Sequence, residues 1–149
     1  ISKYIFNFYV KDPSNKNIKF LRIKIRNIIE DFKNNGLDKD KLFLTLKNLK
    51  KSNQALTFYV EQNIKQNSFV DKNNRSLLLN KNFFDHPHEV VFRSLTDSLK
   101  MIGDKYNYPR GKKIEFIMDK IKKNTLKKET LAGCVINKVN QTVIITKED

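Results

Sequence analysis

Apolar side chains recur at helical spacing through most of this 149-residue chain and give way to a β-type pattern near its end. Stripes that repeat every three to four residues predict four helices, over about residues 17–33, 38–65, 87–103 and a short stretch ending near 124. β-branched and aliphatic residues then form two runs joined by a polar link, residues 130–136 and 142–146, which predict a closing hairpin. We therefore expect an α+β fold that is predominantly helical, with antiparallel helices and a C-terminal β-hairpin.

The connections between these elements indicate where the helices begin and end. Gly36 can end the first helix in a left-handed conformation and Asp38 can cap the second, so the short connection predicts an antiparallel helix pair. Pro87 suits the first position of the third helix, with Asp85 or His86 as its cap. We expect the first two helices to bury the stripes formed by Leu21, Ile25, Ile28, Ile29 and Phe32, and by Leu42, Leu46, Leu49, Leu56, Val60 and Ile64.

Residues 66–85 have a different character from the helical segments around them. Two short apolar runs flank the polar stretch 71–74, which fits either two short strands or a loop around a turn. We place the boundary between the two regions of the chain here, with residues 1–66 before it and 67–149 after it.

The chain is strongly basic, with 30 lysine and arginine residues against 16 acidic ones and a formal net charge of +14. Such a balance favours a polyanionic partner, because lysine and arginine release counterions when they neutralise phosphates. Abundant lysine, asparagine and isoleucine are also typical of an AT-rich genome, so the position of the charge is more informative than its total. Residues 11–26 carry six basic groups against Asp12, and residues 100–128 carry ten against three acidic ones.

Cys134 is the only cysteine, so a disulfide framework is excluded and a reduced, cytoplasmic setting is expected. It lies within an apolar β-type run, where a buried and inert thiol is more common than a nucleophile. No apolar run approaches the roughly 20 residues that span a bilayer, so we expect no membrane partner. The chain starts at Ile1 in a strand-like pattern, which suggests a fragment.

The residues needed for common active sites are sparse. The four glycines lie far apart, so no glycine-rich phosphate loop can be drawn, and we expect the chain not to bind ATP by itself. His86 and His88 could supply two metal ligands, but no cysteine or further histidine completes a set, and a place at a helix start explains them as well. We assign neither a metal site nor a catalytic residue.

The most informative local motif is the turn Asp12-Pro13-Ser14-Asn15, which leads into the first helix. On that helix Lys19, Arg22 and Arg26 fall three and four residues apart and share one face, which is either a solvated surface or a ligand-binding one. If the ligand is RNA, aromatic residues could also contact it, because unpaired bases stack on aromatic rings. The candidates are Phe83 and Phe84, for which core packing is the alternative, and Tyr106 and Tyr108, which precede Arg110, Lys112 and Lys113.

Two motifs together resemble the tRNA(Ile)-lysidine synthetase family. The turn Asp12–Asn15 with Arg22 and Arg26 is similar to the family's D-P-S-N turn followed by R-x-x-x-R on a helix. The stretch 108–115, Y-P-R-G-K-K-I-E, and the stretch 130–136, T-L-A-G-C-V-I, resemble the family's later basic helix and its T-L-x-G-C-x-I strand. The order and separation of the motifs also fit, so the resemblance extends from about residue 8 to residue 147.

The resemblance implies an ATP-dependent ligase that adenylates the wobble cytidine of an isoleucine tRNA with a CAU anticodon, after which lysine attacks to form lysidine. In the family, ATP and Mg²⁺ belong to a domain with an S-G-G-x-D-S loop, which this sequence lacks. Residues 1–66 are then expected to hold the end of the ATP-domain region and a helical linker, and residues 67–149 a substrate-binding region. The chain alone should be inactive, with no cofactor of its own.

What the resemblance transfers to this chain is tRNA binding. The implied partners are tRNA(Ile), the missing ATP domain and, for the whole enzyme, free lysine, while a homodimer stays an open alternative. The alternative functions are a non-enzymatic RNA- or DNA-binding module and a helical scaffold whose charge reflects genome composition. The predicted RNA-binding residues are Lys19, Arg22, Arg26, Tyr108, Arg110, Lys112 and Lys113, with Asp12, Pro13, Ser14 and Asn15 forming the motif turn.

Overall fold

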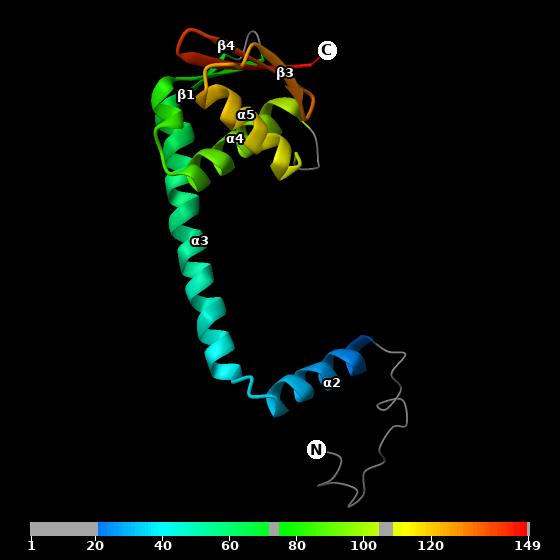
Figure 1. Cartoon of the computed structure of the whole chain (residues 1–149). Coiled ribbons are helices and arrows are strands. Elements are labelled where there is room, and N and C mark those ends of the chain that lie inside the picture. Colours follow the sequence, from blue (N-terminus) through cyan, green and yellow to red (C-terminus); the bar gives the residue numbers. More distant parts are fainter. Residues whose placement is uncertain (1–20, 72–74, 105–108, 149) are drawn as a thin grey trace, which may run out of the picture. The chain divides into compact units, whose positions relative to one another are not determined.

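The computed structural model describes residues 21–71, 75–104 and 109–148. The chain divides into two units between Lys50 and Lys51. The first unit contains helix α2 (Leu21–Asn34) and the beginning of helix α3 (Lys39–Asn67), and the second contains the rest of α3 and all later elements (Figure 1). The assignment of residues 1–66 to a linker region and of residues 67–149 to a substrate-binding region stays a prediction.

The connection between α2 and α3 has the predicted chemistry. Gly36 adopts φ +90°, a left-handed conformation that glycine tolerates without strain, and the Leu37 N–H donates to the Phe32 carbonyl at 2.8 Å. The Asp38 carboxylate then accepts hydrogen bonds from the backbone N–H groups of Asp40 and Lys41, at 2.9 and 3.3 Å. The predicted end of the first helix and cap of the second are therefore confirmed.

The predicted burial of the stripes on α2 and on the first half of α3 is wrong. Ile23 is the buried side chain of α2, while Leu21 is 71% exposed and Phe32 54% exposed. On α3, Leu42, Leu46 and Leu49 are exposed, and burial begins near Leu56 and is complete at Val60. Periodicity identified the helices correctly but not their partners, because in the described part of the first unit no sheet or third helix covers these stripes.

The second unit is built on a five-stranded antiparallel sheet. Its strands lie in the order β1-β2-β5-β4-β3. The segment 66–85, for which the sequence allows either strands or a loop, forms two of these strands and a 3₁₀ helix, η2 (Lys81–Phe84). The strands are β1 (Ser68–Asp71), β2 (Ser76–Leu79), β3 (Lys128–Leu131), β4 (Cys134–Val139) and β5 (Thr142–Lys147).

The predicted closing hairpin is confirmed as the pair β4 and β5, with Ile136 opposite Ile145. The run 130–136 is not one strand, however. Ala132 and Gly133 both adopt positive φ, at 56° and 74°, so the chain reverses there and Leu131 pairs with Cys134 across a second tight turn. Apolar composition alone did not reveal this reversal, because Ala132 carries no turn signal of its own.

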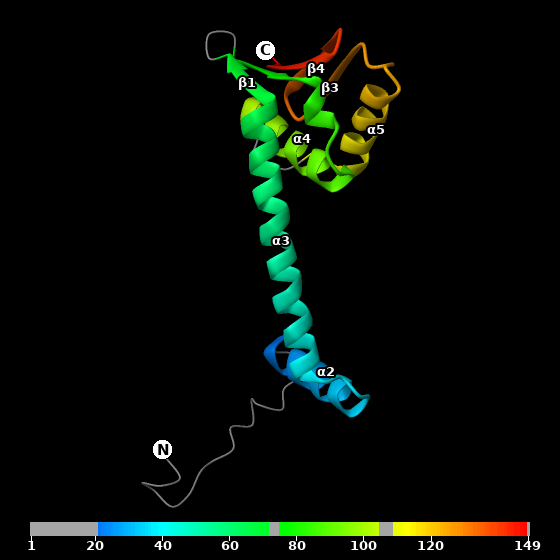
Figure 2. The same cartoon turned by 90° about the vertical axis from the view of Figure 1, so that its left-hand side faces the viewer.

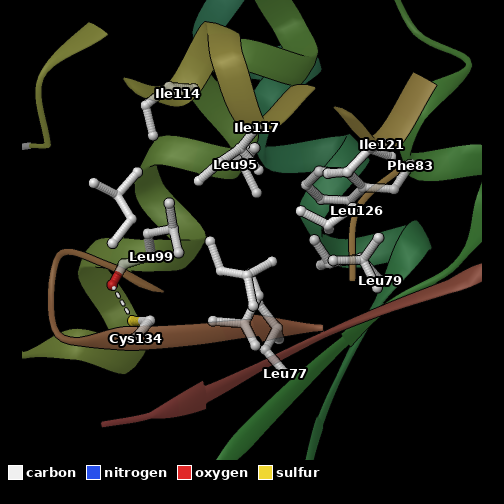
Figure 3. Close-up of a cluster of buried hydrophobic side chains, with 14 residues drawn as sticks. Leu77, Leu79, Phe83, Leu95, Leu99, Ile114, Ile117, Ile121, Leu126 and Cys134 are labelled. Carbon is white, nitrogen blue, oxygen red and sulfur yellow. Dashed lines mark hydrogen bonds between the residues drawn. The ribbon is translucent and has the colours of Figure 1, made fainter. Parts of the chain in front are cut away.

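Helices α4 (His88–Gly103) and α5 (Gly111–Lys122) lie on one face of this sheet (Figures 1 and 2). Alternate strand residues point at them, so Leu77, Ile136 and Ile145 are fully buried. Figure 3 shows how Leu95 and Leu99 of α4 meet Ile114, Ile117 and Ile121 of α5 in this core. The α+β fold with a predominance of helix is thereby confirmed.

Cys134 is buried in this core, as its place in an apolar run predicts. Its thiol is fully buried and donates to the Leu99 carbonyl at 3.3 Å (Figure 3). A cysteine buried among apolar side chains commonly packs as a small apolar residue, which agrees with the interpretation of Cys134 as part of the core.

A polar network fixes the end of α3 to η2 and α4. Asn63 is fully buried, and its amide nitrogen lies 3.1 Å from both the Phe83 carbonyl and the Ser94 hydroxyl. Its carbonyl oxygen accepts from Asn67 at 2.9 Å, and the Asn67 amide also lies 3.2 Å from the His86 ring. The network therefore sets the position of η2 and His86, which adjoin a pocket described below.

Candidate nucleic-acid interface

Arg22 and Arg26 lie on α2, four residues apart on one face. Four residues of α-helix rise about 6 Å, so the two guanidinium groups can approach one stretch of ligand backbone. Both side chains are exposed, and the first turn of α2 contains no acidic residue. The exposed surface formed by Arg22 and Arg26 is called the α2 arginine face below.

A second basic surface forms where α5 begins, at Arg110, Lys112 and Lys113. Arg110 occupies the N-cap position and makes no side-chain capping bond, and all three side chains are exposed. The first turn of α5 has no acidic residue. Because the N-terminus of a helix carries partial positive charge, three cations there oppose the helix dipole instead of complementing it. This set of residues is called the α5 basic turn below.

The lysines at the other end of α5 differ in this respect. Lys120 and Lys122 lie in the last turn, where cations stabilise the helix dipole. Lys120 pairs with Glu129 and also lies 4.4 Å from the centre of the Phe116 ring. These contacts explain Lys120 as a stabilising residue, whereas among the described residues no comparable contact is found for the α5 basic turn.

The structure therefore brings the predicted RNA-binding residues together in two groups, one in each unit. Arg22 and Arg26 belong to the first unit, and Arg110, Lys112 and Lys113 belong to the second. Lys19 and Tyr108, together with the motif turn Asp12, Pro13, Ser14 and Asn15, lie outside the described residues. Phe83 is fully buried and serves the core, while Phe84 is partly exposed beside it.

The predicted capping role of Asp85 or His86 is wrong. Pro87 occupies the N-cap position of α4 without a side-chain cap, and its carbonyl accepts from the N–H groups of Val90 and Val91. His86 contacts Asn67 instead, and the His88 ring lies 2.9 Å from the Glu115 carboxylate. Within the ranges that the structure describes, no group of three histidine, cysteine or acidic side chains could hold a metal ion.

Sequence reasoning missed a pocket of about 470 Å³ in the second unit. Lys81 of η2, Lys122 of α5 and Lys138 of β4 contribute to its wall, although they are far apart in the chain. Only the strand alternation carried a signal, since Lys138 follows Cys134 and Ile136 on the inward-facing positions of β4. A lysine at such a position is unusual enough to mark a polar site.

Burial raises the pKa of the Asp97 carboxyl on α4, although the charges of Lys100 and Arg93 lower it. At pH values between the ordinary pKa of this carboxyl and its raised pKa, the folded chain binds more protons than the unfolded chain. Stability from this group is therefore full below the ordinary value of 3.8 and declines as the pH rises through the raised pKa.

We expect Asp97→Asn to become more stable relative to the unchanged chain as the pH rises, because the variant carries no charge to desolvate. Urea unfolding at about pH 3 and about pH 7 measures this, through the difference between the two free energies of unfolding. An equal difference at both pH values would contradict the assignment.

None of the helices in the described ranges combines the length and the apolar character needed to cross a membrane.

Comparison with known proteins gives a consistent set of relatives. The chain is 28% identical over 155 residues to the tRNA(Ile)-lysidine synthase of Wolbachia sp. subsp. Brugia malayi (strain TRS), which covers 99% of this chain and 35% of the relative. It is 27% identical over 143 residues to the tRNA(Ile)-lysidine synthase of Wolbachia pipientis wMel, with 94% and 33% covered. The enzyme of the same name from Anaplasma marginale (strain St. Maries) is 28% identical over 131 residues, with 87% and 28% covered.

These matches confirm the resemblance to the tRNA(Ile)-lysidine synthetases that the two motifs predicted. The chain spans about a third of the length of the curated relatives it matches. No model of a known protein family matches it, and no solved structure matches it.

Proposed function

We propose that this chain is the tRNA-holding part of a tRNA(Ile)-lysidine synthetase, the ligase that joins lysine to the wobble cytidine of isoleucine tRNA at the expense of ATP. Relatives of that name match nearly the whole chain, which supports the assignment to tRNA modification. ATP, Mg²⁺ and lysine would be handled by a domain with the S-G-G-x-D-S loop. This chain would then contribute binding and no catalytic group.

The observation that carries the binding role is the α5 basic turn. A helix N-terminus offers backbone N–H groups and positive dipole charge to an anion, and Arg110, Lys112 and Lys113 add three cations in the same place. An isolated protein gains nothing from this arrangement, because the charges repel the dipole and one another. A bound phosphate backbone would be attracted both by the three cations and by the positive end of the helix dipole.

The α2 arginine face supports the same role. Guanidinium groups can contact phosphate oxygens in a bidentate manner, which the ammonium group of Lys24 cannot do. Contacts of this kind position an RNA without reading its sequence, so they would hold the tRNA while its exposed anticodon bases are recognised elsewhere in the enzyme. Arg22 and Arg26 are also the pair that matches the family's R-x-x-x-R motif.

We expect Arg22→Ala combined with Arg26→Ala to weaken tRNA(Ile) binding by roughly 1–3 kcal/mol and to reduce the salt slope by about one to two units. Fluorescence anisotropy with a labelled tRNA(Ile) transcript at several salt concentrations measures both quantities. The charge-matched control is Lys47→Ala with Lys50→Ala, since these two exposed lysines of α3 also lie in the first unit. Unchanged affinity and slope in a folded arginine double variant would reject direct contact.

The alternative is a non-enzymatic RNA- or DNA-binding module that uses the same two basic surfaces. Its support is the charge distribution alone, whereas the ligase assignment also has the curated relatives. Reading the coding sequence upstream of Ile1 discriminates between them. An open frame encoding S-G-G-x-D-S supports the ligase, and a start codon immediately before Ile1 supports the module.

A further inference from the structure

The 470 Å³ pocket of the second unit shares no lining residue with the α2 arginine face or the α5 basic turn. Its volume falls within the range of about 300–1,000 Å³ typical of small-ligand sites. Part of its wall is apolar and comes from η2, both helices and the sheet, namely from Phe84, Val91, Met118, Ile121 and Val143. This wall is suited to a flat, weakly polar group.

Three lysines, Lys81, Lys122 and Lys138, line the same pocket. Lys138 is partly buried and donates to the Ile121 carbonyl at 3.1 Å, which holds its ammonium group at the C-terminal end of α5. Within the described part of the chain, neither Lys81, Lys122 nor Lys138 forms an ion pair with a carboxylate. Asp85 and Asp119 line the same pocket, so the three lysines exceed the acidic side chains of the wall by one, and the wall has a formal net charge of +1. This excess favours a ligand that carries negative charge at one end.

The remaining polar side chains of the wall are of two kinds. Asp85 and Asp119 offer acceptors for amino or hydroxyl groups, and they disfavour a ligand that is anionic throughout. The His86 ring lies 3.2 Å from the Asn67 amide, and the His88 ring lies 2.9 Å from the Glu115 carboxylate. The His88 ring also stacks on Phe92, with 6.5 Å between centroids and 20° between planes.

We propose that this pocket binds a single unpaired nucleotide. The base would lie against the apolar wall near Phe84, its amino groups would reach Asp85 or Asp119, and its phosphate would lie among the three lysines. Unpaired bases stack on phenylalanine and histidine rings in this way when proteins recognise single-stranded RNA. A nucleotide within an RNA strand and a free mononucleotide share this chemistry, and the strand is the source expected if the proposed tRNA-binding function is correct.

Histidine NMR tests the proposal directly, because His86 and His88 are the only two histidines of the chain and both line the pocket. The ring-proton signals of the 149-residue chain are followed during separate titrations with CMP, AMP, a short single-stranded RNA and inorganic phosphate. We expect saturable shifts with the RNA or the mononucleotides at concentrations where phosphate alone has no effect. Lys81→Gln with Lys122→Gln should weaken that binding roughly tenfold, which is the loss expected for charged hydrogen bonds to a phosphate.

The control is Lys51→Gln with Lys65→Gln, which removes the same charge from exposed positions of α3 within the second unit. Shifts with the RNA but not with mononucleotides identify a strand nucleotide, and shifts with both show that a free nucleotide suffices, so either supports the pocket. Equal shifts with phosphate, or no loss in the lysine double variant, would overturn it.

If tRNA(Ile) binds by anisotropy while the histidine signals stay unchanged, the pocket proposal fails and the tRNA-binding function stands. If mononucleotides shift the signals but tRNA(Ile) does not bind, the pocket proposal stands and the tRNA-binding function fails.

Discussion

Gly103→Ala is expected to destabilise the second unit by about 3 kcal/mol, at the upper end of the range for overpacked cores. Gly103 is the last residue of α4, and a Cβ atom there would lie 2.2 Å from the Ala132 carbonyl oxygen and 3.0 Å from the Cys134 sulfur. The Ala132 oxygen belongs to the backbone, so it cannot rotate away as a flexible side chain would. The end of α4 and the turn between β3 and β4 would have to separate.

Gly111→Ala is the matched control for Gly103→Ala. Gly111 also lies at a helix end, but a Cβ atom there would meet the Phe92 ring at 3.5 Å, an ordinary van der Waals distance. We expect its free energy of unfolding to change by less than about 1 kcal/mol, since alanine also restricts the unfolded chain. Urea unfolding of both variants measures the contrast, and equal stabilities would show that the close approach at Gly103 is absent.

Asn63→Ala is expected to cost about 2–4 kcal/mol, because it leaves several buried polar groups without partners. The Phe83 carbonyl and the Ser94 hydroxyl both lose the Asn63 amide, and the Asn67 amide loses the acceptor that Asn63 provides. Asn63 itself is fully buried, so water cannot replace these contacts without opening the end of α3. The effect should extend to η2 and to the His86 ring.

Two controls separate this network from general helix effects. Gln62→Ala and Gln66→Ala flank the network on the exposed side of α3 and should leave the free energy of unfolding within about 0.5 kcal/mol of the original. In Asn63→Ala the NMR signal of His86 should shift more than that of His88, which is held by Glu115 instead. A variant as stable as the two controls would mean that the amide contacts are not formed.

The sequence predicts helix ends well, because these depend on a few neighbouring residues. Gly36 ends α2 and Asp38 caps α3 because backbone conformation and capping chemistry act over three or four residues. The periodicity that predicted α4 and α5 also reflects their burial, with Leu95, Leu99 and Ile114 in the core. The exposed leucines of α3, such as Leu49, show the limit, because periodicity defines a face but does not say what covers it.

The candidate site was predictable to a smaller extent. Arg22, Arg26 and the α5 basic turn were named from their spacing and from motif similarity, and the structure leaves their side chains exposed, as RNA contact requires. The pocket was not predictable, because Lys81, Lys122 and Lys138 meet only after η2, α5 and β4 have packed together. The reversal of the chain at Ala132 was not predicted for a similar reason, since the positive φ of Ala132 accompanies the pairing of β3 with β4.

The central claim is that this chain holds tRNA through exposed cations on α2 and α5. It is tested most directly by the equilibrium binding of the 149-residue chain to a labelled tRNA(Ile) transcript over a series of salt concentrations. We predict saturable binding whose affinity falls linearly on a log–log plot as salt rises, with a slope that the arginine double variant lowers by about one to two units. Absence of saturable binding at low salt, or a slope that the Arg22 and Arg26 substitutions leave unchanged, would contradict the account.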